Sequence, residues 1–396
     1  MKKKEPVIKR KILLKAPTSI HGFDEITGGG LPKGRPTLVC GGAGCGKTLF
    51  AMEFIVRGAQ NFNEPGIFIS FEENDKELIA NVSSLGFDLE DLIAKRKVWI
   101  EHIDIEPELA KPGGQYDLNI LFLQIHNAIE SIGAKRVVLD TIEYLFMVLP
   151  NPIAIRTQLR RLFKWLKKKG VTAIITGERG DNTLTRQGLE EYVSDCVILL
   201  DHRVNDQSSI RRLRIVKYRG STHGTNEYPF IIDEEGFSVL PVTSLGLDYF
   251  SSPERISTGI PRLDTMLSGK GFYRGSTILV SGSAGTGKTS LSAQFIDAAC
   301  RRGERALFFI MEESQNQLLR NMRSIGIDLN QWVKKGLLLF SATRPTLYGL
   351  ETHLANSIKL VNKFKPAVVV LDPINSFVIG KNIFEVTPCS SVLSIF

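Results

Sequence analysis

The sequence predicts an α/β chain that contains two copies of one domain, each with a mostly parallel sheet and helices on both faces. Residues 41–48 fit the phosphate-binding pattern G-x-x-x-x-G-K-[ST], and residues 282–289 repeat it 241 positions later (288 minus 47). Short apolar runs alternate with polar loops and helical patterns, which favours parallel strands joined by crossover helices. A period of about 240 residues indicates a duplicated domain rather than a solenoid.

The length of the chain suits two domains. A chain of 396 residues is long for one hydrophobic core, and its 43% hydrophobic and 23% charged residues are ordinary for a globular protein. We expect a basic N-terminal arm at 1–17, a first domain at 18–245, a linker at 246–256 and a second domain at 257–396.

The composition argues against secreted, zinc-binding and membrane classes. The five cysteines show no C-x-x-C spacing, which favours a reducing compartment over a disulfide framework or a zinc site. No apolar run approaches the ~20 residues that span a bilayer, and the charged N-terminus lacks the apolar region of a signal peptide. We therefore expect a cytoplasmic protein without a membrane partner.

A net charge of +8 raises the question of nucleic-acid binding. Basic residues cluster in the N-terminal arm, at 160–169 and at 211–214. A solvated tail, an amphipathic helix with a charged outer face and a subunit interface explain these clusters without a nucleic-acid partner. Because no aromatic-rich strand face or known nucleic-acid module accompanies the charge, we favour this second interpretation, and a nucleic-acid partner stays an alternative.

The first phosphate loop lies in the context that its chemistry needs. An apolar run at 37–40 predicts a buried strand before the loop, and residues 49–54 open a helix after it. Glycines allow successive backbone N–H groups to face a phosphate, and the helix N-terminus adds its positive dipole end. Lys47 would reach the β- and γ-phosphates, and the Thr48 hydroxyl would ligate Mg²⁺. The residues expected to bind the nucleotide are Gly42, Ala43, Gly44, Cys45, Gly46, Lys47, Thr48 and Leu49, with Ser283, Ala284, Gly285, Thr286, Gly287, Lys288, Thr289 and Ser290 in the second copy.

The repeat continues beyond the loops, and then the second copy stops. Residues 66–73 match 306–313 at an interval of 240, and 136–140 match 368–372 at 232, so a short deletion separates the copies. The first copy goes on to predicted strands at 171–178 and 196–200 and to antiparallel strands at 212–219 and 228–232, whereas only 24 residues follow Asp372. We expect an incomplete second domain, and we suspect a premature stop or frameshift near residue 386.

Asp140 and Asp372 each end a short apolar run. This is the pattern of the Walker B aspartate, which holds Mg²⁺ directly or through water. An ordinary helix-capping aspartate at the end of a strand is the alternative. The phosphate loop upstream of each aspartate favours the magnesium role.

Paired glutamates follow another predicted strand in both copies, at Glu72-Glu73 and Glu312-Glu313. Open α/β sheets place their chemistry at the carboxyl ends of strands, where a carboxylate can polarise the water that attacks the γ-phosphate. A solvated acidic pair at a helix start is the alternative. Because the pair occurs at the same place in both copies, a catalytic role is favoured. The sequence does not show which glutamate of each pair would be the base.

The segment Lys217-Tyr218-Arg219-Gly220-Ser221-Thr222-His223 carries a further signal. Lys217 and Arg219 lie two residues apart and so project to one side of a strand. At a subunit edge they could contact the γ-phosphate bound by a neighbour, as an arginine finger does. A charged edge strand that prevents aggregation explains the residues equally well.

Together these marks are similar to those of KaiC and the KaiC-like tandem RecA-type ATPases, over about residues 19–384. The specific ones are the two phosphate loops, the paired glutamates, the segment 217–223, and Thr176-Gly177-Glu178-Arg179 followed by 188–195. The resemblance implies tandem RecA-like P-loop NTPase domains, ATP and Mg²⁺ as cofactors, and a homo-hexameric ring with ATP between subunits. It implies catalytic roles for Glu72 and Glu73, action of Lys217 and Arg219 in trans, and contact of Ser221 and His223 with the neighbour's nucleotide.

The resemblance also says what the second copy would lack. In RecA-like sheets the strand after Walker B lies beside the phosphate-loop strand, so the second sheet would lack a central member and leave backbone groups unpaired. We expect a poorly stable second half with weak ATP binding at most. In KaiC itself the second copy phosphorylates a Ser/Thr pair well beyond its Walker B strand, and this chain ends before that region. No residue here is assigned as that site, so kinase activity stays uncertain.

Three functions follow as hypotheses. The first is a Mg²⁺-dependent, ATP-hydrolysing KaiC-like ring, of circadian-clock or other signalling type, in which the first copy does most of the hydrolysis. The second is a RecA-like recombination or helicase ATPase that holds DNA through its basic segments. The third is a nucleotide-dependent scaffold that hydrolyses slowly and recruits protein partners.

Overall fold

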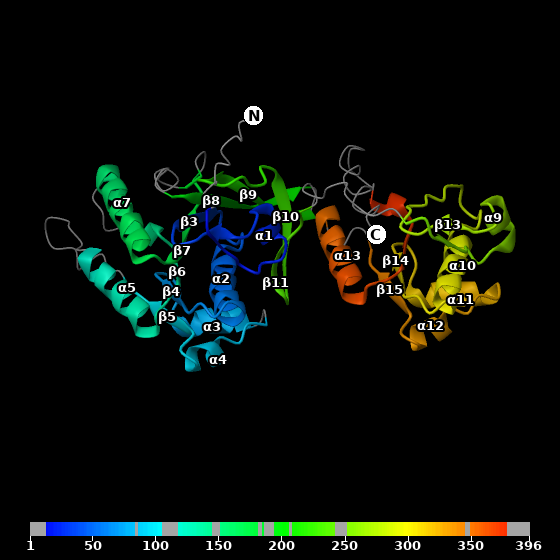
Figure 1. Cartoon of the computed structure of the whole chain (residues 1–396), viewed down its shortest axis with the longest axis horizontal. Coiled ribbons are helices and arrows are strands. Elements are labelled where there is room, and N and C mark those ends of the chain that lie inside the picture. Colours follow the sequence, from blue (N-terminus) through cyan, green and yellow to red (C-terminus); the bar gives the residue numbers. More distant parts are fainter. Residues whose placement is uncertain are drawn as a thin grey trace, which may run out of the picture. The chain divides into compact units, whose positions relative to one another are not determined.

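The computed structural model describes residues 13–83, 86–104, 118–144, 151–180, 184–185, 194–205, 208–241, 252–344 and 349–377. Most of the expected N-terminal arm, residues 188–193, and residues 246–251 of the expected linker lie outside these ranges. The chain divides into two compact units, residues 1–244 and 245–396 (Figure 1).

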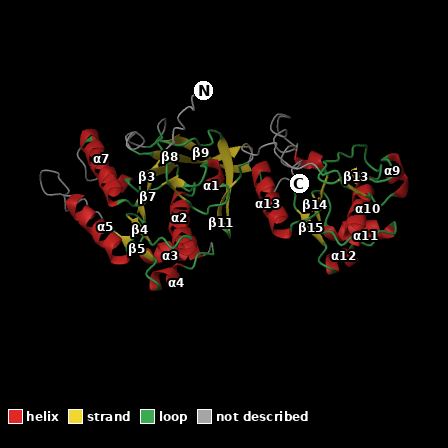
Figure 2. Cartoon of the chain, in the orientation of Figure 1, coloured by secondary structure: helices red, strands yellow, loops and turns green. Residues whose placement is uncertain are grey.

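The first unit is built on a nine-stranded sheet of order β11-β10-β9-β8-β3-β7-β6-β4-β5 (Figure 2). From β8 to β5 neighbouring strands are parallel, and β9, β10 and β11 extend the sheet as antiparallel strands, so the predicted mostly parallel sheet is confirmed. The strands are β3 (Pro36–Gly41), β4 (Gly66–Ser70), β5 (Val98–His102), β6 (Arg136–Asp140), β7 (Thr172–Glu178), β8 (Cys196–Asn205), β9 (Ser208–Tyr218), β10 (Glu227–Asp233) and β11 (Gly236–Val239). A small hairpin of β1 (Lys15–Ala16) and β2 (Leu31–Pro32) precedes it.

Helices cover both faces of this sheet. They are α1 (Phe23–Ile26), α2 (Lys47–Asn61), α3 (Asp75–Ser83), α4 (Leu89–Ala94), α5 (Leu118–Ile132) and α7 (Pro152–Lys169). Side chains alternate between the faces of a strand, and β6 shows the result. Val138 packs in the cluster that contains α2, while Val137 and Leu139 pack in the cluster that contains α5 and α7. All three are fully buried, and each burial is worth about 1.5–3 kcal/mol relative to exposure.

The ends of α7 show how local sequence sets a helix boundary. The Asn151 side chain accepts a hydrogen bond from the Ala154 N–H at 2.9 Å, and Pro152 occupies the first turn, where its missing N–H costs nothing. Gly170 ends the helix in the left-handed conformation, with φ of 71°. Lysines at 167–169 lie in the last turn, where cations interact favourably with the helix dipole.

In the described residues of the second unit the sheet has three parallel strands, in the order β15-β14-β16. The elements are β12 (Arg255–Ile256), α9 (Pro261–Met266), β13 (Phe272–Tyr273), α10 (Lys288–Arg301), β14 (Ala306–Ile310), α11 (Gln315–Ser324), α12 (Asn330–Lys334), β15 (Leu338–Ala342), α13 (Leu350–Phe364), β16 (Val368–Asp372) and the 3-10 turn η4 (Ile374–Phe377). One core cluster joins α10, α11 and α12 to these strands.

The segment before the second phosphate loop differs from its counterpart. In the first unit β3 is wholly buried, between β7 and β8. Residues 276–281 occupy the same place in the second copy, yet they form no strand, and Leu279 is 76% exposed. The described part of the second unit holds no strand that corresponds to β7 or β8, so this segment has no neighbour with which to pair. This is the place at which the sequence predicted a missing central strand.

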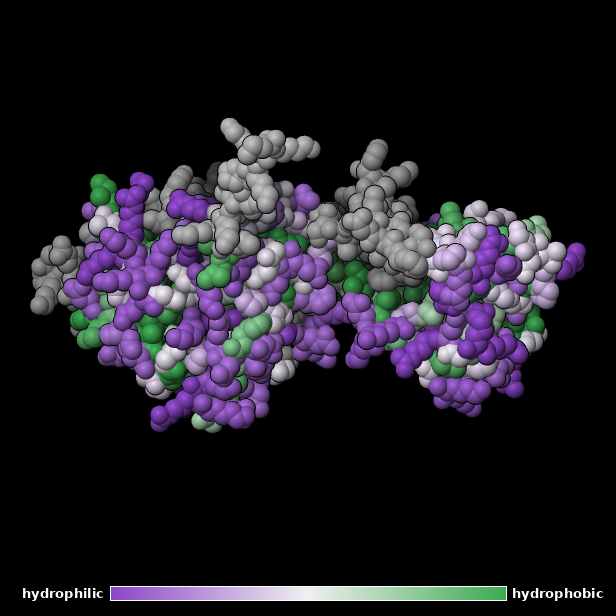
Figure 3. Space-filling model, in the orientation of Figure 1, coloured by the Kyte–Doolittle hydropathy of each residue, from purple (hydrophilic) through white to green (hydrophobic). Residues whose placement is uncertain are grey.

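Hydrophilic residues cover most of the visible face of each unit, with apolar residues scattered among them (Figure 3). Among the described residues, no helix combines the length and the apolar character that crossing a membrane requires.

Candidate active site

The first phosphate loop connects β3 to α2. Gly46 precedes the helix with φ of 100°, a left-handed conformation that favours glycine. Gly41, at the end of β3, has no room for a side chain, because a Cβ there would lie 2.4 Å from the Leu200 carbonyl oxygen. The loop therefore presents backbone N–H groups at the N-terminus of a 15-residue helix, which is the geometry that binds phosphate.

Lys47 lies over this loop. Its Nζ donates hydrogen bonds to the carbonyl oxygens of Gly41 at 3.0 Å and Gly42 at 2.9 Å. The side chain is buried, and the neighbouring Cys45 belongs to the core cluster, where burial raises the pKa of its thiol. Cys45 is thus a packing residue of the loop, and Lys47 supplies the charge that a phosphate needs.

Asp140 ends β6 beside the loop and is 6% exposed. Its Oδ2 accepts a hydrogen bond from the Thr48 hydroxyl at 2.8 Å, and its Oδ1 accepts one from the Thr176 hydroxyl. Burial raises the pKa of Asp140, while the hydroxyl groups of Thr176 and Thr48 and the charge of Lys47 oppose that shift.

This pair of oxygen donors fits Mg²⁺. A hydroxyl and a carboxylate that already contact each other are ligands of the type that Mg²⁺ takes alongside water and substrate phosphates. The described residues contain no group of three or more histidine, cysteine, aspartate or glutamate side chains able to hold a metal ion. An ion at Thr48 and Asp140 would therefore need phosphate and water oxygens to complete its coordination.

The two glutamates after β4 have different surroundings. Glu73 Oε2 accepts a hydrogen bond from the Asn81 amide of α3 at 3.2 Å. Glu72 is exposed, and its negative charge contributes to the raised pKa of Asp140. The second unit repeats the difference, since Glu313 binds Asn321 at 3.3 Å while Glu312 accepts a hydrogen bond from Ser376 at 3.2 Å.

The segment 217–223 lies at the opposite end of the sheet from its own phosphate loop. Tyr218 pairs with Cys196, which pairs with Thr37 at the start of β3. Gly41, where the phosphate loop begins, is four residues further along β3, about 13 Å at ~3.3 Å per residue. The strand register thus separates this segment from the phosphate loop of the same unit.

Arg219 follows β9 directly and points to solvent. Its side chain is 55% exposed, and its guanidinium lies 3.9 Å from Asp195. Ser221 Oγ donates to the Thr222 carbonyl oxygen, and His223 Nδ1 lies 2.9 Å from the Gly224 carbonyl oxygen. Lys217 is part of β9 itself. The contacts of Arg219, Ser221 and His223 thus lie within or beside the segment 217–223 and at Asp195, away from the phosphate loop of the same unit.

Comparison with known proteins identifies the family. The family model described as "ATPase: KaiC" matches residues 16–244 and 256–384. The chain belongs to the KaiC ATPase family. It is 58% identical over 371 residues to the "Circadian clock protein KaiC2" of Synechocystis sp. (strain PCC 6803), covering 94% of this chain and 65% of that protein. The "Circadian clock oscillator protein KaiC" is 40% identical in Parasynechococcus marenigrum and 41% identical in Parathermosynechococcus lividus, in each case over 92% of this chain and over 72% and 68% of the relative. The chain thus spans about two thirds of the length of these KaiC relatives.

The second KaiC match keeps the local form of the loop but not its surroundings. Lys288 donates to the carbonyl oxygens of Gly282 at 2.9 Å and Ser283 at 2.8 Å, as Lys47 does in the first unit. Its loop is exposed, however, and within 252–344 and 349–377 no hydrogen bond joins the Thr289 side chain to Asp372. In the first KaiC region the Thr48 hydroxyl of the loop therefore donates a hydrogen bond to Asp140. In the described part of the second region, Thr289 and Asp372 do not make the corresponding hydrogen bond.

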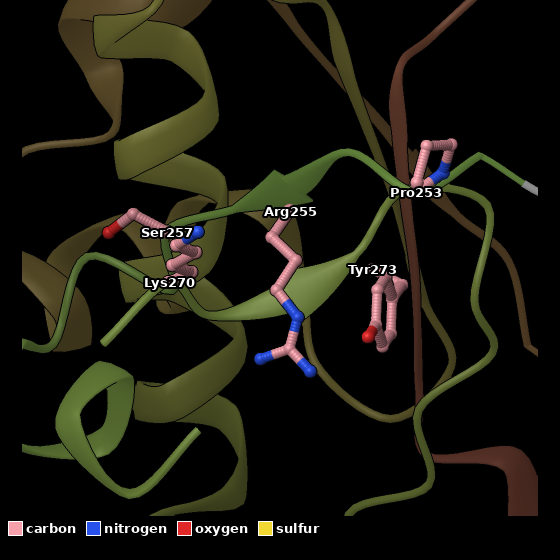
Figure 4. A pocket seen from close by; sticks show the side chains of 5 residues that line it. All are labelled: Pro253, Arg255, Ser257, Lys270 and Tyr273. Carbon is pink, nitrogen blue, oxygen red and sulfur yellow. The ribbon is translucent and has the colours of Figure 1, made fainter. Parts of the chain in front are cut away.

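A cavity of about 510 Å³ in the second KaiC region lies at the β12–β13 hairpin, where Arg255 extends between Ser257 and Tyr273 (Figure 4). Arg255 stacks on the Tyr273 ring at 4.1 Å and donates to the Leu267 carbonyl oxygen at 2.6 Å. Its counterpart Lys15 lies over Tyr218 of β9 in the first region. The lining residues of the cavity, which also include Pro253 and Lys270, contain no member of the phosphate loop, so we assign no chemistry to this cavity.

Two contacts of the site escaped the sequence-based reasoning. Thr176 belongs to the segment 176–179 but received no role of its own, although a threonine directly after the apolar run 173–175 was a usable signal. Tyr218 anchors the segment 217–223 through a hydrogen bond from its hydroxyl to the Gly30 carbonyl oxygen at 2.9 Å. Nothing in the sequence pairs those two residues, which are 188 positions apart.

Proposed function

We propose that this chain binds and hydrolyses ATP with Mg²⁺, and that copies of it form a homo-hexameric ring with nucleotide between neighbouring subunits. One observation carries the proposal: Lys47, Thr48 and Asp140 meet at one end of the sheet, while Lys217 and Arg219 lie at the other end. A site divided in this way is complete only when a second subunit supplies the missing cations.

Within one subunit, the phosphate loop would bind the phosphates through its backbone N–H groups and Lys47. Thr48 and Asp140 would hold Mg²⁺, which supplies charge neutralisation on the phosphate oxygens. Glu72 would polarise the attacking water, because it is exposed and its charge acts on Asp140, whereas Glu73 accepts a hydrogen bond from Asn81.

Across the interface, Lys217 and Arg219 would stabilise the charge that develops on the γ-phosphate of the neighbour's nucleotide. Ser221 and His223 would line the same nucleotide. The exposure of Arg219 supports this role, since its ion pair with Asp195 at 3.9 Å is long and leaves the guanidinium accessible.

The second KaiC region would contribute little hydrolysis. This region keeps the candidate residues of the site, which are Lys288, Thr289, Glu312, Glu313 and Asp372. Its loop is exposed, however, and in the described residues no hydrogen bond joins the Thr289 side chain to Asp372. We propose weak ATP binding there at most. No residue of this chain is proposed as a phosphorylation site.

The relatives named above are circadian clock proteins. We propose by analogy a cytoplasmic signalling protein that works with other proteins. Membership of the KaiC family does not favour the alternative of a DNA-dependent recombination or helicase ATPase, and a DNA-stimulated ATPase with steep salt dependence would revive it.

The test combines the ATPase rate with the ATP-dependent mass of the assembly. Lys47→Ala and Arg219→Ala should each abolish most hydrolysis, and mixing the two variants should restore part of it, because mixed rings contain interfaces with one intact loop and one intact arginine. Arg214→Ala is the matched control, since it removes an exposed arginine from β9, the strand that Arg219 follows. A monomer that hydrolyses ATP normally without Arg219 would overturn the ring mechanism.

A further inference from the structure

Three hydrogen bonds connect residues 140–143, which form the end of β6 and the turn after it, to the C-terminal part of β7. The Thr176 hydroxyl donates to Asp140 Oδ1, and the Thr176 carbonyl oxygen accepts from the Ile142 N–H at 3.1 Å. The Glu178 N–H donates to Glu143 Oε1 at 2.5 Å. These contacts join residues 140–143 to the strand that lies between β6 and β3.

The carboxylate of Asp140 is held from both sides. A carboxylate can rotate about its last side-chain bond, whose preference is broad. Here one oxygen accepts the Thr176 hydroxyl, and the other accepts the Thr48 hydroxyl at 2.8 Å. Because Oδ1 is held by Thr176, Oδ2 faces Thr48, the residue that would bind the same Mg²⁺ ion.

Thr176 is itself rigidly placed. It is fully buried, it pairs with Val39 of the phosphate-loop strand, and its branched side chain has few rotamers. Its backbone is tied to the same turn that carries Asp140. Its backbone therefore pairs with the phosphate-loop strand, and its side chain holds the carboxylate of Asp140.

We propose that Thr176 is a positioning residue, which holds the Asp140 carboxylate in the orientation that lets it and Thr48 bind Mg²⁺ together. The proposal rests on the proposed function, because it assigns a role toward the Mg²⁺ of the nucleotide complex. Groups that orient metal ligands without touching the metal commonly contribute 10–100-fold to metal affinity.

The second copy supplies an internal comparison. The described part of the second unit contains no hydroxyl group that donates to the Asp372 carboxylate, and there the Thr289 side chain makes no hydrogen bond to it. Asp140, which accepts the Thr176 hydroxyl, is thus also hydrogen-bonded to Thr48 of its phosphate loop. Within the described residues, Asp372 has neither of these contacts.

The experiment measures the Mg²⁺ concentration that gives half-maximal binding of a fluorescent ADP analogue. It uses the full chain carrying Lys288→Ala, so that only the first loop reports. Thr176→Val, which keeps the shape and removes the hydroxyl, should raise this concentration about tenfold. Thr176→Ser, which restores a hydroxyl, should lie within about twofold of the parent. Thr172→Val is the matched control, because the Thr172 hydroxyl on the same strand accepts from the Gly34 N–H instead, and its Mg²⁺ requirement should not move.

A second arm tests whether Thr176 acts through Asp140. In an Asp140→Asn background, Thr176→Val should cause no further rise, since the carboxylate that it orients is gone. An unchanged Mg²⁺ requirement in Thr176→Val, or an equal rise in Thr172→Val, would overturn the proposal. Should the valine variant not fold, Thr176→Ala removes the same hydroxyl and is judged by the same criterion. If the parent chain binds the analogue no better than its Lys47→Ala variant, it is the proposed function that fails.

Discussion

Replacement of Arg136 should unfold the first unit far more readily than its distance from the phosphate loop suggests. Arg136 begins β6 and is fully buried. Its guanidinium donates to Glu64 Oε2 at 2.9 Å, to the Phe54 carbonyl oxygen at 2.9 Å and to the Pro17 carbonyl oxygen at 2.8 Å. The group thus joins the chain before α1, the middle of α2 and the loop before β4 at one point.

The size of the effect follows from what Arg136→Met leaves behind. Methionine fills much of the volume but leaves the Glu64 carboxylate and two carbonyl oxygens without their donor. Removing one partner of a buried ion pair costs about 3–5 kcal/mol, so we expect a loss of that size in the free energy of unfolding. Lys33→Ala is the control, because Lys33 binds the same Glu64 from an exposed position and should cost at most about 1 kcal/mol.

The assay is urea unfolding followed by tryptophan fluorescence in a Trp332→Phe background. The remaining tryptophans, at 99 and 165, both lie in the first unit, so the signal reports that unit. If Arg136→Met and Lys33→Ala shift the unfolding midpoint equally, the buried network does not carry the stability assigned to it.

Three further predictions concern single groups. Gly41→Ala should destabilise the first unit by about 1–3 kcal/mol, since its Cβ would meet the Leu200 carbonyl oxygen at 2.4 Å. Gly42→Ala, where the space is open, should not, and a thermal melt compares the two. Tyr218→Phe should lower kcat more than it raises KM, because the lost hydroxyl anchors the segment 217–223 and not the phosphate loop. An unchanged kcat would contradict this. For Glu64, burial raises the pKa, but hydrogen bonds from its two cationic partners outweigh burial and hold the pKa below the usual 4.5. Its stabilising contribution should be complete above about pH 4.5 and should be lost as the pH falls through the lowered value. Replacing Arg136 removes part of that lowering, so the fall in the free energy of unfolding below about pH 4.5 should be smaller in Arg136→Met than in the parent, and acid titrations of both proteins check this.

The sequence alone determined the features that depend on local pattern. The phosphate loop was predictable because glycines, lysine and threonine at set intervals, between an apolar strand and a helix, leave few other structures. The parallel sheet followed from the alternation of apolar strands and helices, and β7 to β10 lie where their patterns placed them. The duplication was predictable because the same local patterns recur in the same order, at intervals of 241, 240 and 232 residues.

Tertiary structure decided the features that depend on contacts between distant residues. Only the strand register shows that Lys217 and Arg219 lie at the opposite end of the sheet from Lys47. Only packing separates Glu72 from Glu73 and brings Thr176 to Asp140, 36 positions earlier in the chain. The segment 276–281 is the clearest case, because its apolar sequence resembles that of β3, yet it forms no strand in the described second unit. A strand requires neighbours for its backbone hydrogen bonds, and those neighbours come from elsewhere in the chain.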